Sequence, residues 1–79
     1  MPYFVYILEC KDKTYYCGWT KNLHNRVLLH NKGTASKYTR SRLPVRVVYF
    51  EKKKSLSHAL KREIQIKRLS RKEKQKLIH

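Results

Sequence analysis

Five residues of this chain have side chains whose types and spacing could do chemistry. They are Tyr6, Tyr16, Arg26, His30 and Glu63. A phenol or an imidazole can move a proton, a guanidinium can neutralise an anion, and a carboxylate can hold a divalent metal ion. As a set they resemble the parts of an enzyme that hydrolyses phosphodiesters, provided that the fold brings them to one place. For each residue alone, a structural role is the alternative.

The charge of the chain predicts a polyanionic partner. Its 79 residues include 20 Lys and Arg against 5 Asp and Glu, which gives a formal net charge of +15. Such an excess repels itself and costs stability, so a polyanion is the usual reason to keep it. We expect nucleic acid, with a merely soluble basic protein as the alternative. The sequence indicates no protein partner.

Nothing in the sequence predicts a membrane protein. No run approaches the ~18 apolar residues of a spanning helix, and the N-terminus lacks a charged region followed by an apolar one. Cys10 and Cys17 are too few for a disulfide framework or a four-cysteine metal site. Reduced thiols are usual in the cytosol. We therefore expect one cytoplasmic domain over residues 1–79.

The first half of the chain predicts a hairpin followed by a helix. Residues 3–9 and 14–20 are rich in aromatic and β-branched residues, as strands are, with a polar turn between them. Asn22 is a plausible N-cap, and Gly33 stands where a helix would end. Residues 33–44 show no apolar period, so we expect a loop there.

The second half predicts a strand and two helices. In the third strand, residues 45–51, a continuous apolar run predicts a central, buried position in the sheet. Ser55 can cap a helix that ends near Leu69, and the Ser-Arg-Lys-Glu run from Ser70 fits a capping box. The order β-β-α-β-α-α predicts an α/β fold with a small, three-stranded, mainly antiparallel sheet flanked by helices.

The register of the first hairpin decides whether the two tyrosines meet. With a three-residue loop, Lys11 to Lys13, Tyr6 faces Gly18 and Leu8 faces Tyr16. The tyrosines then share one face of the sheet as diagonal neighbours, and Gly18 leaves space opposite the Tyr6 ring. The same register keeps the two cysteines apart. A two-residue loop would place the tyrosines on opposite faces.

The helix after Ser55 carries a charge where apolar residues gather. At about 100° per residue, Glu63 and Lys67 fall within the apolar arc of the helix. That arc comprises Leu56, Ala59, Leu60, Ile64 and Ile66. An unpaired carboxylate is costly to bury, so three arrangements could hold it: an ion pair with Lys67, a hydrogen-bond network or a metal ion. On the earlier helix, Arg26 and His30 share one face.

In their order and spacing these residues resemble the GIY-YIG nuclease family. The family includes intron homing endonucleases, some restriction enzymes and the incision domain of an excision-repair nuclease, and the chain is most similar to small stand-alone bacterial members. YFVYILEC resembles the first motif, with Tyr6 as its tyrosine, and YYCGWT resembles the second, with Tyr16 and Gly18. KNLHNRVLLHNKG is similar to the helix that follows. The first motif has Val5 in place of its glycine.

The resemblance implies a mechanism. The implied reaction is hydrolysis of a phosphodiester in nucleic acid, and DNA is the favoured substrate. Because the family includes an excision-repair nuclease, the resemblance also suggests a role in DNA repair. One divalent ion, Mg²⁺ or Mn²⁺, would be held by Glu63 and waters. Tyr16 is favoured as general base and Tyr6 as the group that orients water. Arg26 would neutralise charge on the phosphate, and His30 would bond the phosphate or share the proton transfer.

Five basic residues flank these positions and are candidate phosphate contacts without sequence preference. They are Lys21, Lys37, Arg40, Arg42 and Lys67. Many larger family members carry a separate DNA-binding domain, which this sequence lacks. The competing hypothesis is a binding module, which would keep the fold and the basic surface for nucleic acid without catalysis.

Overall fold

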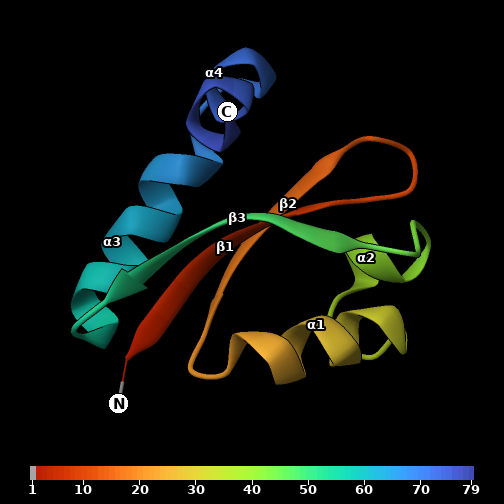
Figure 1. Ribbon diagram of the computed structural model, residues 1–79, viewed down its shortest axis with the longest axis horizontal. Helices are drawn as coiled ribbons and strands as arrows, with labels where there is room; N and C mark the ends of the chain where they lie inside the picture. The colour runs from red at the N-terminus through yellow and green to blue at the C-terminus, as the bar shows by residue number, and fades with distance from the viewer. Residues whose placement is uncertain (1) are drawn as a thin grey trace.

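Three antiparallel strands and four helices make up the fold in a computed structural model, which describes residues 2–79 (Figure 1). The strands are β1 (Tyr3–Glu9), β2 (Tyr15–Thr20) and β3 (Arg46–Lys53), and the helices are α1 (Leu23–Asn31), α2 (Lys37–Arg40), α3 (Leu56–Lys67) and α4 (Arg71–Ile78). The strand order is β2-β1-β3, so β1 is central. The α/β class and the succession of elements are confirmed, with one short additional helix, α2. None of the helices in residues 2–79 could cross a membrane.

Helices cover both faces of the sheet because both faces of β1 are apolar. Side chains alternate along a strand, so Val5 and Ile7 point to one face and Tyr6 and Leu8 to the other. The first pair packs in the core beneath α3 and α4, and the second pair packs with residues of α1. All four are buried. The helices α1 and α3 accordingly lie on different sides of the strands (Figure 1).

The predicted hairpin register is confirmed. Tyr6 pairs with Gly18 and Leu8 with Tyr16. The Cys10 amide donates to the Thr14 carbonyl at 2.8 Å, which closes the three-residue loop. Within that loop Lys13 has a φ of +70°. The two cysteines are free thiols, as the register predicts.

The predicted helix caps are also confirmed. The Asn22 side chain accepts a hydrogen bond from the Asn25 amide at the start of α1. Gly33 follows the end of α1 with a φ of +80°, a conformation that glycine adopts without strain. Ser70 and Glu73 form the capping box at the start of α4. Local sequence therefore sets where these helices begin and end.

The prediction of a central, well-buried third strand is wrong, because β3 is an edge strand. It pairs with β1 alone, and a register shift between Ile7 and Leu8 interrupts the ladder. Phe50 is 54% exposed and packs edge-on against Phe4, with ring centroids 6.0 Å apart. The apolar run therefore covers both faces of a strand at the sheet edge.

The predicted loop over residues 33–44 contains a helical turn, α2. The Ser36 hydroxyl accepts a hydrogen bond from the Tyr38 amide at 3.1 Å and so caps this turn. Thr39, in the middle of α2, is fully buried. A single capped turn has no apolar period, which explains why the sequence pattern did not reveal it.

The apolar arc predicted for α3 is only partly buried. Ala59 and Ile66 are fully buried, whereas Leu56, Leu60 and Ile64 are 39–49% exposed. The helix is rotated from the predicted arc, because Ala59 and Ile66 pack in the core with Val5 and Ile7. The same orientation places Arg62 Nη2 2.8 Å from Oε2 of Glu51 on β3.

Two isoleucines on α3 test this rotation. We predict that Ile66→Ala lowers the free energy of unfolding by about 2–5 kcal/mol, because the deletion opens a cavity in the core. The matched change Ile64→Ala should cost less than about 1 kcal/mol, since this side chain is half exposed. Urea denaturation of both variants measures the difference. Equal losses would contradict the packing of α3.

Candidate active site

The phenol of Tyr6 lies across Gly18 on the neighbouring strand. A Cβ atom built on Gly18 would stand 2.7 Å from the Tyr6 Oη and 2.9 Å from its Cζ. The Tyr16 ring would lie 3.3 Å away at its Cε2 atom. Both tyrosines therefore crowd this position, and any side chain on residue 18 would displace them. Glycine here is a requirement of packing, as the register predicts.

A chain of hydrogen bonds leads from Tyr6 into the protein. Its Oη lies 2.9 Å from Nε2 of His30, and Nδ1 of His30 lies 2.9 Å from Oγ1 of Thr39. The Thr39 hydroxyl donates its one hydrogen to the Ser36 carbonyl at 3.4 Å. It must then accept from Nδ1–H, which leaves Nε2 as an acceptor for the Tyr6 hydroxyl. The network thus assigns a neutral His30 and a Tyr6 that donates.

Burial and neighbouring charges favour the same protonation states. Burial raises the pKa of Tyr6 well above its ordinary value, the Tyr16 phenol adds to this, Arg26 acts to lower the pKa and Glu63 to raise it. Burial and the Arg26 charge both lower the pKa of His30. The charges of Arg26 and Glu63 therefore both act on the Tyr6 phenol, although α1 and α3 cover opposite faces of the sheet.

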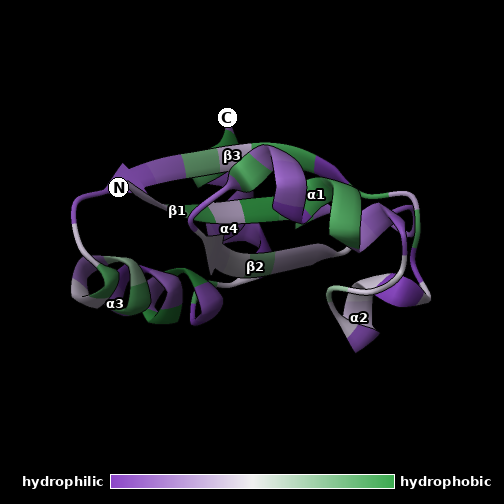
Figure 2. Cartoon of the chain, turned by 90° about the horizontal axis from the view of Figure 1, so that it is seen from below, coloured by the Kyte–Doolittle hydropathy of each residue, from purple (hydrophilic) through white to green (hydrophobic). Residues whose placement is uncertain are grey.

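A surface groove runs along the outer edge of β2. Its lining residues, which define the tyrosine groove, are Tyr15, Tyr16, Cys17, Tyr38, Lys67 and Lys74. The Tyr16 ring lies edge-on to His30, at 5.2 Å between centroids, and stacks on Tyr38 at 6.0 Å. The strand β2 runs between α3 and α2, which stand to either side of it (Figure 2). The groove is therefore where elements from both faces of the sheet meet.

Glu63 is the least satisfied carboxylate near this edge. Its side chain is 14% exposed, and its closest cation is Lys67 Nζ, 3.6 Å from Oε1. Glu51 is equally buried, at 15%, yet it contacts Arg62 and Lys53 at 2.8 and 3.0 Å and accepts from the Tyr49 hydroxyl. A half-buried carboxylate with one long contact retains free lone pairs, which is the environment of a metal ligand.

The remaining acidic residues are occupied elsewhere. Asp12 pairs with Arg42 and Glu9 with Arg46, while Glu73 caps α4. Among residues 2–79 no group of three or more His, Cys, Asp and Glu side chains could hold a metal ion. The residues that line the tyrosine groove include no carboxylate, and Glu63 adjoins it only through Lys67. A metal ion held by Glu63 would therefore have one carboxylate and several waters. This donor set fits Mg²⁺, which keeps most of its hydration.

The five predicted phosphate contacts do not all lie together. Lys67 lines the tyrosine groove, and Lys37 and Arg40 belong to α2, the helix that carries Tyr38. Arg42 is already paired with Asp12, at 3.1 Å, and its guanidinium stacks on Tyr38 at 4.0 Å. Lys21 lies beyond the other end of β2, over the Tyr3 ring.

Sequence reasoning missed two residues of the site, both on α2. Thr39 orients His30 through its hydroxyl, and Tyr38 extends the aromatic wall beside Tyr16. The available signal was Ser36, a favourable N-cap residue two positions before Tyr38. It was not recognised because four residues are too few to show helical periodicity.

Comparisons with known proteins agree on one family. The model of the GIY-YIG catalytic domain matches residues 2–77. A UPF0213 protein of Syntrophus aciditrophicus is 57% identical over 76 residues, which cover 95% of this chain and 87% of that protein. The solution NMR structure of a UPF0213 protein from Bacillus halodurans is 41% identical with a TM-score of 0.64, covering 99% of this chain and 83% of that one. An E. faecalis protein solved by NMR has a TM-score of 0.66 at 37% identity, covering 96% and 81% respectively.

A methyl group at position 18 tests the crowding of the tyrosines. We predict that Gly18→Ala lowers the free energy of unfolding by about 1–3 kcal/mol, because the added carbon overlaps the Tyr6 phenol. The cost should be smaller in a Tyr6→Phe background, where the closest contacting atom is gone. A double-mutant cycle by chemical denaturation measures this coupling. Additive costs would show that Tyr6 does not lie over Gly18.

Proposed function

We propose a function from one premise, which is that this chain belongs to the GIY-YIG family. The protein is a divalent-metal-dependent endonuclease that hydrolyses phosphodiester bonds in nucleic acid, with DNA as the favoured substrate. One observation carries the proposal: Tyr16 and Lys67 line one groove, and Glu63, one turn before Lys67 on α3, has a single long ion pair within residues 2–79.

Glu63 is the residue that would hold the metal ion, Mg²⁺ or Mn²⁺. The bound ion would polarise the scissile phosphate and stabilise the leaving oxygen. The long contact to Lys67 leaves most of the carboxylate lone pairs available. Lys67, which is 54% exposed, is free to swing toward a phosphate once the carboxylate has another cation.

Tyr16 is the better candidate for the general base. Its ring lines the tyrosine groove, so its hydroxyl can approach a water molecule there. Tyr6 is 1% exposed and its hydroxyl already donates to His30, so its remaining lone pairs could only accept a hydrogen bond, which suits it to orient a water molecule. His30 acts through Tyr6, and Thr39 acts through His30; both are positioning residues. The roles of the two tyrosines follow from exposure.

The cations around the groove would bind the substrate. Arg26 acts on Tyr6 and His30 electrostatically and would neutralise charge that grows on the phosphate oxygens. Lys67 and Lys74 line the groove, and Lys37 lies on α2 beside it. Lysines contact phosphates without reading bases, so this binding would be independent of sequence. We place the activity in the cytoplasm, where the two free thiols would stay reduced.

Cleavage of nucleic acid tests the proposal. We predict that the protein nicks plasmid or branched DNA with Mg²⁺ or Mn²⁺ and not in EDTA. Glu63→Gln, Tyr16→Phe and Arg26→Gln should each lower the rate by about 10²-fold or more, because each removes a group acting at the reacting phosphate. Glu9→Gln is the matched control, since Glu9 is similarly buried but pairs with Arg46 elsewhere. Single-turnover rates on one labelled substrate give the comparison.

The outcomes separate the enzyme from a binding module. Cleavage that persists unchanged in all three site variants would indicate a contaminating nuclease and overturn the proposal. Binding of DNA and RNA without cleavage of any substrate would favour a module that keeps the fold and the basic surface. An RNA strand cut faster than the matching DNA strand would correct the substrate and leave the site assignment standing.

A further inference from the structure

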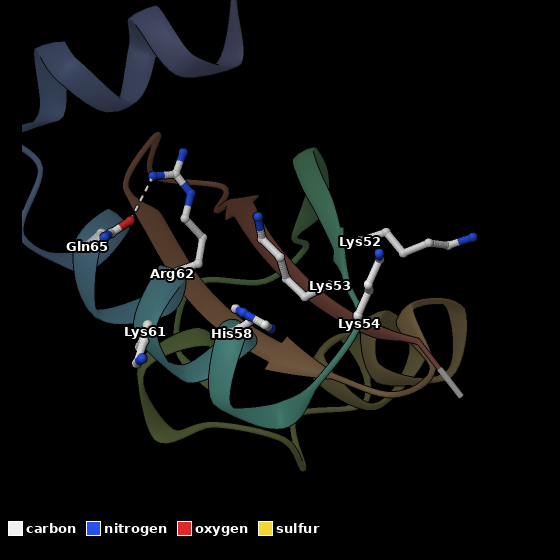
Figure 3. Close-up of a pocket in the computed structure, with 7 residues that line it drawn as sticks. All are labelled: Lys52, Lys53, Lys54, His58, Lys61, Arg62 and Gln65. Atoms are coloured by element: carbon white, nitrogen blue, oxygen red, sulfur yellow. Dashed lines mark hydrogen bonds between the residues drawn. The ribbon is translucent and has the colours of Figure 1, made fainter.

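A basic cleft lies on the far side of α3 from the tyrosine groove. Four lysines and an arginine line it together with His58: Lys52, Lys53, Lys54, Lys61 and Arg62. The lysines at 52–54 come from the end of β3 and the turn after it, and the other residues come from α3 (Figure 3). At about 100° per residue, Lys61 lies roughly 160° around α3 from Glu63. We call this surface the β3–α3 cleft.

One carboxylate organises the floor of the cleft. Glu51 receives Nε and Nη2 of Arg62 at 2.9 and 2.8 Å, and Lys53 Nζ lies 3.0 Å away. Burial acts to raise the pKa of Glu51, but hydrogen bonds from Arg62, Tyr49 and Lys53 outweigh it and hold the pKa at about 2. Glu51 is therefore ionised at any physiological pH. It fixes two cations and leaves the cleft with a large positive excess.

The other cations of the cleft have no acidic partner. Within residues 2–79, Lys52, Lys54 and Lys61 form no ion pair. The hydroxyl of Ser55 lies 2.7 Å from Nδ1 of His58 and accepts from the His58 amide. A group of exposed cations on one surface, most of them without an acidic partner, favours an anionic ligand.

We propose that the β3–α3 cleft binds the sugar-phosphate backbone of nucleic acid outside the tyrosine groove, as a second and sequence-independent contact. The inference takes the nature of its ligand from the proposed function. Among residues 2–79 the lining of the cleft includes no Phe, Tyr or Trp, so it offers no surface on which a base could stack. Lysine ammonium groups are flexible point charges, which suit phosphates at varied positions.

The spread of the charges favours a long polyanion over a small phosphate compound. The cations are distributed over a strand end, a turn and two turns of helix and do not converge on one point. The protein is 31 Å long, a length over which duplex DNA passes about 9 base pairs. A longer nucleic acid that fills the tyrosine groove therefore has backbone to spare for a second surface. The cleft would add affinity without selecting a sequence.

Two triple variants with the same change of charge test the cleft. In one, Lys52, Lys54 and Lys61 are each changed to Gln; in the control, Lys11, Lys32 and Lys72 are changed to Gln. The control lysines are exposed, and they line neither the cleft nor the tyrosine groove. Fluorescence anisotropy with a labelled duplex of about 30 base pairs, in EDTA and over a range of salt, measures affinity separately from cleavage.

We expect the cleft variant to lose about tenfold more affinity than the control at 0.1 M salt, and its log–log salt slope to fall by about 2–3. Equal losses of duplex affinity in both variants would overturn the proposed contact at the cleft. If the wild-type chain nevertheless cleaves nucleic acid, the proposed function stands.

If only the cleft variant loses affinity, the contact at the cleft is supported. If the wild-type chain then cleaves no substrate, the proposed endonuclease activity is overturned while the contact stands. Saturable binding of inorganic phosphate at the cleft, with duplex affinity unchanged in the variant, would assign it to a small ligand instead.

Discussion

The hydrogen bond between the Tyr6 hydroxyl and His30 is the constraint on which the candidate site depends. Tyr6 belongs to the central strand and is almost completely buried, so its hydroxyl must find a partner inside the protein. His30 supplies that partner from α1, and Thr39 fixes the imidazole from α2. The ring reaches this position only because Gly18 has no side chain. One buried polar group thus fixes the relative positions of β1, β2, α1 and α2.

The five acidic residues differ in how many partners each one has. In a chain with 20 Lys and Arg, cations are abundant and carboxylates are scarce. Glu51 collects three partners, namely Lys53, Tyr49 and Arg62 of α3. Glu63 is left with one long contact. Arg62 and Glu63 are neighbours on α3. The same helix therefore contacts the carboxylate of Glu51 and carries the carboxylate that we propose for metal binding.

This arrangement gives α3 two different sides. Lys67 lines the tyrosine groove at the β2 edge and contacts Glu63, the proposed metal ligand. Lys61 and Arg62 face β3, where cations surround a carboxylate that is already neutralised. A net charge of +15 is costly for so small a domain. Seven of the 20 Lys and Arg line these two surfaces on either side of α3.

The parts of the fold that depend on neighbouring residues could be predicted from the sequence. The hairpin register follows from loop length and strand alternation, and it correctly placed Tyr6 opposite Gly18. The caps at Asn22 and Ser70 are equally local. Contacts between distant segments could not be predicted in this way. The edge position of β3 depends on which side of β1 is still open.

The missed residues have similar physical causes. The orientation of α3 depends on contacts with the sheet, such as the core packing of Ile66 and the bond from Arg62 to Glu51, that no helical wheel contains. Thr39 became important only because α2 brings its hydroxyl to His30. The resemblance to a family named the candidate side chains, whose roles stay predictions, and the packing of the sheet determines where they lie.

The binding of Mn²⁺, followed by NMR in the absence of nucleic acid, tests the central claim most directly. That claim is that Glu63 and the tyrosines form one site at the β2 edge. The account predicts saturable paramagnetic broadening centred on Tyr16, Gly18 and Glu63, which Glu63→Gln abolishes and Glu9→Gln leaves intact. Broadening centred on Glu51 or Glu9, or broadening unchanged by Glu63→Gln, would contradict it.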